Sequence, residues 1–93
     1  MPGDPPMIDR LIGEVLVLDL RSPYVCLGTL VAVDAEFYAL ADADLHDLRD
    51  STATREIYIY DSLRLGIRRN RARVLVRRDE VVAVTRFADV AES

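Results

Sequence analysis

The sequence has one cysteine, no lysine and no tryptophan among its 93 residues. The single thiol, Cys26, excludes an intramolecular disulfide and suits a reducing compartment. No apolar run reaches the ~18 residues that a membrane-spanning helix needs. Residues 1–6 are acidic and proline-rich, without the basic start and apolar stretch of a secretory signal. We therefore expect a cytoplasmic protein with a flexible leader at 1–6 and no membrane partner.

Charge is unevenly distributed along the chain, although the formal net charge is only −4. Residues 1–62 contain twelve acidic residues and four arginines, whereas residues 63–93 contain eight arginines and four acidic residues. The arginine-rich part could meet phosphate groups or the acidic surface of a second copy of the chain. Hydrophobic residues make up 51% of the sequence, enough for one modest core.

Short β-favouring runs separated by turn residues predict a mainly β domain. The predicted strands are 14–20, 25–33, 37–46, 71–77 and 81–85, after a short helix at 6–12 that Gly13 closes. Gly28, inside the second run, indicates a bend or bulge where another backbone comes close. Asp42 and Asp44 share one side of the third run, so we expect its end to face water.

The connection 47–70 permits two interpretations. Its stretch 56–60 alternates as a strand would, but the segment is also capped at both ends and has apolar residues at helical spacing. We favour a helix, and an ordered one. The candidate caps are Ser51, Thr52 and Thr54 at the start and Gly66 at the end, and the apolar residues that need burial are Ile57, Ile59, Leu63 and Leu65.

Two stretches resemble the paired motifs of the Sm-like (LSm) proteins. Residues 15–46 resemble the first motif, with Gly28 as its internal glycine and Asp34 as its aspartate. Residues 74–84 resemble the second, in which an Arg-Gly-Asp-like turn separates two apolar strands; here the turn reads Arg77-Arg78-Asp79. The order and spacing of the two motifs together give the resemblance its specificity.

The resemblance implies a fold and an assembly. Sm-like proteins form a five-stranded, bent antiparallel barrel of SH3 type with an N-terminal helix, and close into rings of six or seven copies by pairing their last two strands. The rings commonly bind single-stranded U-rich or A-rich RNA. We therefore expect an Sm-like domain at 7–90 with a helical insertion at about 47–70, between the third and fourth strands.

The residues implied for RNA binding are Asp34, Tyr38, Arg77 and Arg78. Three positions depart from the family pattern: Glu36 stands where a base-stacking residue is usual, Tyr38 replaces the asparagine that reads a base edge, and Arg78 replaces the usual glycine. Tyr38 could stack on a base instead. Two functions follow: an Sm-like ring that binds single-stranded RNA or acts in an RNA–protein complex, or an Sm-like scaffold that binds another protein without RNA.

No arrangement typical of an enzyme is present, and we predict neither a catalytic residue nor a cofactor. Cys26 lies between Val25 and Leu27 in an apolar strand, so we interpret it as a buried thiol. The acidic residues around His46 lack the glycine turn and second ligand group of a cation loop, so we predict no metal site.

Overall fold

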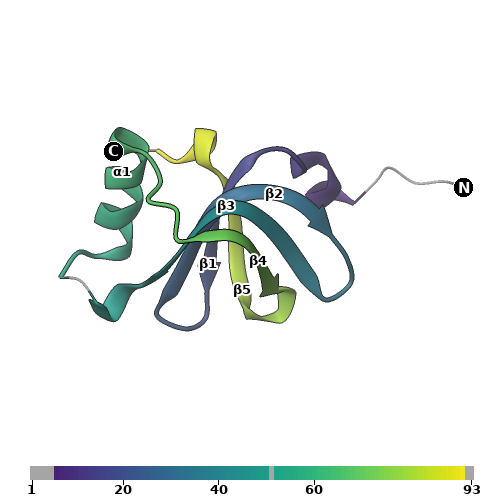
Figure 1. Cartoon of the computed structure of the whole chain (residues 1–93), viewed down its shortest axis with the longest axis horizontal. Helices are drawn as coiled ribbons and strands as arrows, with labels where there is room; N and C mark the ends of the chain where they lie inside the picture. The colour runs from purple at the N-terminus through teal and green to yellow at the C-terminus, as the bar shows by residue number, and fades with distance from the viewer. Residues whose placement is uncertain (1–5, 51, 92–93) are drawn as a thin grey trace, which may run out of the picture.

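The computed structural model describes residues 6–50 and 52–91 and shows a mainly β fold, as predicted (Figure 1). One α-helix, α1 (Arg55–Leu65), lies between the third and fourth strands of this part of the chain. The strands are β1 (Val15–Leu20), β2 (Tyr24–Val33), β3 (Phe37–Asp47), β4 (Arg71–Arg77) and β5 (Val81–Arg86), and the short 3-10 helices are η1 (Met7–Leu11), η2 (Leu48–Asp50), η3 (Arg78–Glu80) and η4 (Phe87–Asp89). The predicted leader at 1–6 lies, except for Pro6, outside the described residues.

The strands form one bent antiparallel sheet in the order β4-β3-β2-β1-β5. Gly28 lies at an irregularity of the β2–β3 pairing, as its position predicted. A Cβ atom there would lie 3.0 Å from the Cβ of Ala43 and 3.2 Å from the carbonyl oxygen of Ala41. The close approach of β3 therefore requires glycine at this point of the bend.

The same irregularity, on the β3 side, overturns one expectation. Ala41 pairs with Thr29 and Asp44 with Leu27, so β3 has one more residue than β2 over this stretch. Asp42 takes up the extra length with a φ of 51°. Because a bulge changes which side chains face inward, Asp42 is exposed but Asp44 is buried. The prediction that this end of the strand faces water was wrong for Asp44.

Both faces of the central strands are covered, which explains their continuous apolar runs. Leu16, Leu18 and Cys26 belong to a core on one face of the sheet. Val17, Val25 and Leu27 alternate with them along the strands and pack with Ile59 of α1 on the other face. The inserted helix thus provides part of a second core layer (Figure 1).

The predicted helix in the insertion is confirmed. The side chain of Thr54 accepts a hydrogen bond from the Ile57 amide at 3.2 Å, and Gly66 ends the helix with a φ of 91°. Thr52 lies before the helix, and Ser51 lies outside the described residues.

The expected burial of the helix holds for only part of its apolar side chains. Ile59 is buried and Leu63 is half-buried, but Ile57 is 50% exposed and Leu65 is 76% exposed. The helix faces the sheet along one side only, and Ile57 and Leu65 lie away from the position of Ile59 at ~100° per residue. The segment is ordered, as predicted, although two of its four apolar anchors face outward.

The outer strands of the sheet are β4 and β5, the two strands that the family resemblance implies for ring pairing. Each presents a large exposed apolar side chain, Leu75 on β4 and Val82 on β5. Within 6–50 and 52–91, the chain contains no helix with the length and apolar character needed to cross a bilayer.

Candidate functional site

The β2–β3 turn and η3 enclose a hollow of about 370 Å³ at one end of the sheet. Two hydrogen bonds hold these segments together: the Arg78 amide donates to the Glu36 carbonyl at 2.8 Å, and the Arg78 guanidinium donates to the Asp34 carbonyl at 2.6 Å. The hollow is lined by Ala35, Glu36, Phe37, Arg77, Arg78 and Asp79. The two sequence motifs therefore meet here, and two of the four predicted site residues line the space.

Asp34 shapes the turn and does not line the hollow. Its Oδ1 accepts hydrogen bonds from the amides of Glu36 at 2.8 Å and Phe37 at 2.7 Å. These donors hold the pKa of the Asp34 carboxyl below its usual value. Asp34 thus fixes the turn whose carbonyl oxygens receive Arg78.

Tyr38 lies in the core rather than at the surface. Its side chain is only 8% exposed, and the Arg78 guanidinium lies over its ring, 5.2 Å from the centroid. The hypothesis that Tyr38 stacks directly on a base does not fit this placement, because Arg78 covers the ring. The ring instead supports Arg78 through a cation–π contact.

Arg78 also replaces the glycine of the family turn without backbone strain. Among the described non-glycine residues only Asp42 has a positive φ, so η3 does not need a glycine at this position. The neighbouring Arg77 is 67% exposed at its side chain and pairs with Asp79 at 3.0 Å. With Glu36 also present, the hollow contains two guanidinium groups and two carboxylates.

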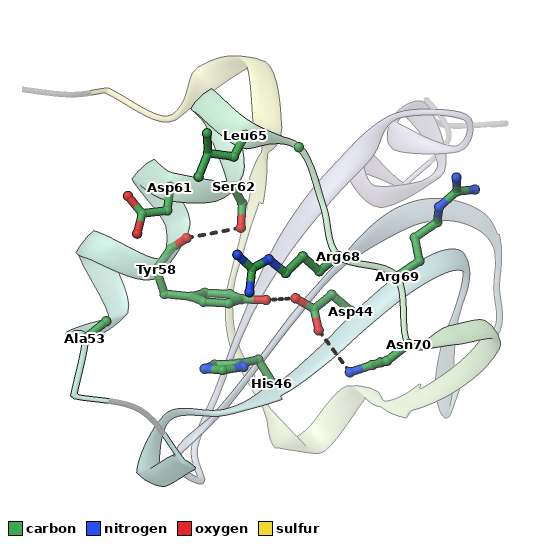
Figure 2. Close-up of a pocket in the computed structure, with 11 residues that line it drawn as sticks. Asp44, His46, Ala53, Tyr58, Asp61, Ser62, Leu65, Arg68, Arg69 and Asn70 are labelled. Carbon is green, nitrogen blue, oxygen red and sulfur yellow. Dashed lines mark hydrogen bonds between the residues drawn. The ribbon is translucent and has the colours of Figure 1, made fainter.

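A larger pocket, of about 490 Å³, lies between α1 and the end of β3 (Figure 2). The Tyr58 hydroxyl donates a hydrogen bond to the buried carboxylate of Asp44, and the Asn70 side-chain amide donates to the same carboxylate at 3.0 Å. The ring of His46 stacks on Tyr58 with centroids 4.1 Å apart. The Asn70 side chain also pairs with the backbone of Leu45, so the segment after α1 is fixed to β3.

Burial raises the pKa of the Asp44 carboxyl above its usual value, against the opposing charges of His46 and Arg68. Local sequence patterns could not predict this network, since the partners of Asp44 lie 14 and 26 positions away and the carboxylate turns inward only through the bulge at Asp42. The solvated strand end predicted from these acids is correct for Asp42 and wrong for Asp44.

The other acidic residues near His46 are engaged by arginines. Asp42 pairs with Arg69 at 3.3 Å, and Asp47 pairs with Arg49 at 2.8 Å. The Arg49 side chain and amide lower the pKa of the Asp47 carboxyl to about 2. In the part of the chain that the structure describes, no group of three or more His, Cys, Asp or Glu side chains is arranged to hold a metal ion.

The sequence matches no protein-family model and no curated protein. Its structure is similar to that of a Sm protein from Pyrococcus abyssii, solved in complex with a uridine heptamer, with a TM-score of 0.60, 18% identity, and coverage of 89% of this chain and 99% of that chain. It is also similar to an Sm-like protein from Archaeoglobus fulgidus, with a TM-score of 0.58, 15% identity, and coverage of 86% and 88% of the two chains. The five strands, their order and these two likenesses show that the chain has the fold of the Sm-like proteins.

Proposed function

We propose that this chain forms a homo-oligomeric ring and binds single-stranded RNA at the hollow beside Arg77 and Arg78. The observation that supports this most strongly is the fixed position of Arg78, which is held by the Asp34 carbonyl and the Tyr38 ring. A guanidinium that is already positioned loses less conformational entropy when it binds a phosphate or stacks on a base. The neighbour from Pyrococcus abyssii was solved with a uridine heptamer, in agreement with this class of ligand.

The four predicted site residues have different proposed roles. Arg77 and Arg78 contact the RNA, since both line the hollow and Arg77 is largely exposed. Asp34 and Tyr38 act as positioning residues: one fixes the turn and the other lies beneath the Arg78 guanidinium. Nucleic-acid recognition often uses such arginine planes beside unpaired bases.

The ring rests on the two edge strands. Among the residues that the structure describes, β4 and β5 each have one side without a partner strand, and each strand has an exposed apolar side chain, Leu75 or Val82. Pairing β4 of one copy with β5 of the next would satisfy these backbone groups and cover the apolar side chains. We propose six or seven copies, the number that the family resemblance implies.

Two further proposals concern chemistry and location. Cys26 is fully buried, and burial raises the pKa of its thiol to about 12, which makes it a poor nucleophile. We propose no catalytic role for it or for another described residue. A free buried thiol also suits the cytoplasm, where we place the protein.

The RNA proposal is tested by titrating fluorescent oligo-U and oligo-A with the assembled protein at low salt. Replacing Arg77 or Arg78 by alanine should weaken binding by about 1–3 kcal/mol and reduce its salt dependence. Arg49→Ala, at an exposed arginine outside the hollow, should have little effect. A wild-type ring with no measurable affinity for either oligonucleotide would contradict the proposal.

A protein-binding scaffold remains the second candidate, and one observation favours it. Glu36 and Asp79 put two carboxylates in the hollow, and carboxylates repel phosphate. Such a mixed surface suits a partner protein with complementary charges. A ring that copurifies with a protein and without nucleic acid would support this function over RNA binding.

A further inference from the structure

The pocket beneath α1 is separate from the hollow at Arg77 and Arg78. The hollow lies beside Phe37, where β3 begins, and the pocket lies beside Asp44 and His46, near the end of β3. Its outer wall comes from the insertion, through α1 and the segment that follows it (Figures 1 and 2). A ligand bound there would contact the insertion at about 47–70, the segment in which this chain departs from the Sm-like pattern.

Most charged and polar groups around this pocket already have partners. The Asp44 carboxylate accepts from two side chains, and the Ser62 hydroxyl donates to the Tyr58 carbonyl at 3.1 Å. Two ion pairs engage other lining residues, between Asp61 and Arg64 at 2.8 Å and between Arg69 and Asp42 at 3.3 Å. These contacts leave the wall with little unused capacity to accept a hydrogen bond from a ligand.

His46, whose buried Nε2 atom has no hydrogen-bond partner among the described residues, is one exception, and Arg68 is the other. Arg68 is exposed and lines the pocket, and no hydrogen bond or ion pair joins its guanidinium to another residue within 6–50 and 52–91. Its charge acts on the nearby carboxylate of Asp44, which is already bonded to Tyr58 and Asn70. The pocket therefore offers a cationic donor and favours a ligand with carbonyl, ring-nitrogen or phosphate acceptors.

The aromatic wall indicates a flat ligand. His46 stacks on one face of the Tyr58 ring, with an interplanar angle of 7°. Figure 2 shows the Arg68 side chain on the opposite side of the same ring, with both side chains facing the pocket. Among the described residues, the arginines in cation–π contact with tyrosine rings are Arg49 and Arg78, so Arg68 lies on this side of Tyr58 without stacking on its ring. An aromatic base fits such a site, because every base has a π-face and acceptor edges.

We propose that this pocket binds one nucleotide, whose base stacks on the face of Tyr58 turned away from His46 while Arg68 binds an acceptor of the base or its phosphate. The exposed Leu65 adds an apolar surface at the rim. Asp44 and Asp61 in the wall disfavour a polyphosphate, so the ligand has a single phosphate group. This chemistry is available both in a free mononucleotide and in one residue of a single-stranded RNA.

The test is a titration of the isotope-labelled protein with the four ribonucleoside monophosphates and with oligo-U and oligo-A, followed by NMR. Amide shifts should concentrate at α1, the end of β3 and residues 66–70. Arg68→Gln should weaken binding about tenfold or more, because it removes a charged donor. Tyr58→Leu should abolish the stack, whereas Tyr58→Phe keeps the aromatic face. Arg49→Gln is the matched control, since this arginine is exposed but lies outside the pocket.

The two ligand sources give different results. Binding of a free mononucleotide that Arg68→Gln weakens and Arg77→Ala leaves unchanged would assign a free nucleotide. If amide shifts appear at the pocket only with oligonucleotides and are lost in Arg68→Gln, the ligand is one residue of a single-stranded RNA. The RNA source rests on the proposed function, but the mononucleotide arm does not, so the two proposals can fail separately. Three results would overturn this inference. The first is the absence of nucleotide-induced shifts at the pocket, and the second is binding that Arg68→Gln and Tyr58→Leu leave unaffected. The third is stronger binding of an acidic peptide than of any nucleotide.

Discussion

The Tyr58 hydroxyl donates a hydrogen bond to the buried carboxylate of Asp44 and so joins the inserted helix to the third strand of the sheet. Asn70 donates to the same carboxylate from the other end of the insertion. One buried acid therefore organises both the helix and the segment that returns to β4. The pocket beneath α1 exists because these contacts hold its walls in place.

Removing the tyrosine hydroxyl should destabilise the fold. Tyr58→Phe leaves one oxygen of a buried carboxylate without its donor, which costs about 1–3 kcal/mol. Urea unfolding followed by circular dichroism measures this change in the free energy of unfolding. Tyr60→Phe is the control, because the Tyr60 hydroxyl bonds to the Ala91 carbonyl at an exposed position. Equal losses in the two variants would contradict an anchoring role for Tyr58.

The buried carboxylate of Asp44 makes the free energy of unfolding depend on pH in a defined direction. Burial raises the folded-state pKa of Asp44 above its ordinary value of 3.8, so the folded chain holds this proton more tightly than the unfolded chain. The stabilising contribution of Asp44 is complete below pH 3.8 and is lost as the pH rises through its folded-state pKa. Asp34, Asp47 and Asp89 have lowered pKa values, so their contributions are instead lost on acidification below 3.8.

The variant Asp44→Asn separates the pH-dependent contribution of Asp44 from those of the other three aspartates. The variant keeps the shape of the side chain but cannot titrate, and His46 and Arg68 still face it. As the pH rises above 3.8 and through the folded-state pKa of Asp44, the free energy of unfolding of the wild type should fall relative to that of the variant. Urea titrations at several pH values measure this difference. Parallel pH profiles for the two proteins would show that Asp44 does not titrate in this range.

The second core layer should depend on the inserted helix. Ile59 is 9% exposed and packs with Val17, Val25 and Leu27. Ile59→Ala should cost about 2–4 kcal/mol of unfolding free energy through lost burial and the cavity left behind. Ile57→Ala, at a half-exposed position on the same helix, should cost clearly less in the same denaturation experiment. A small loss at Ile59 would mean that the helix adds little to the core.

The bend of the sheet should not tolerate a side chain at Gly28. A methyl group there would meet the Cβ of Ala43 at 3.0 Å and the backbone of Ala41 at 3.2 Å. Gly28→Ala should therefore destabilise the protein by about 1–3 kcal/mol through overcrowding. Thermal unfolding measures the loss, and an unchanged melting temperature would show that β3 can move away.

Local patterns in the sequence were sufficient to predict the architecture. Alternation and turn residues located the five strands, and Thr54 and Gly66 marked the ends of the helix, because each signal depends on neighbours in the chain. The burial of Asp44 could not be predicted in this way. It depends on a bulge at Asp42 that reverses the facing of the side chains, and alternation assumes a regular strand.

The candidate site could be predicted only where it depends on neighbours in the chain. The second motif placed Arg77 and Arg78 at a turn, and both line the hollow. The position of Tyr38 beneath the Arg78 guanidinium depends on contact between residues of β3 and η3 that are far apart in the sequence. The pocket at Tyr58 was missed because its partners come from three separate segments of the chain.

The most direct test of the proposed RNA-binding ring is light scattering on the purified protein, with absorbance recorded at about 260 and 280 nm, before and after addition of oligo-U. The expected result is a discrete species of six or seven copies of the 10.5 kDa chain that takes up the oligonucleotide. Val82→Asp, which puts a charge on the exposed edge of β5, should reduce this species to smaller ones. A wild-type protein that stays a 10.5 kDa monomer and takes up no oligonucleotide would contradict both the ring and its function.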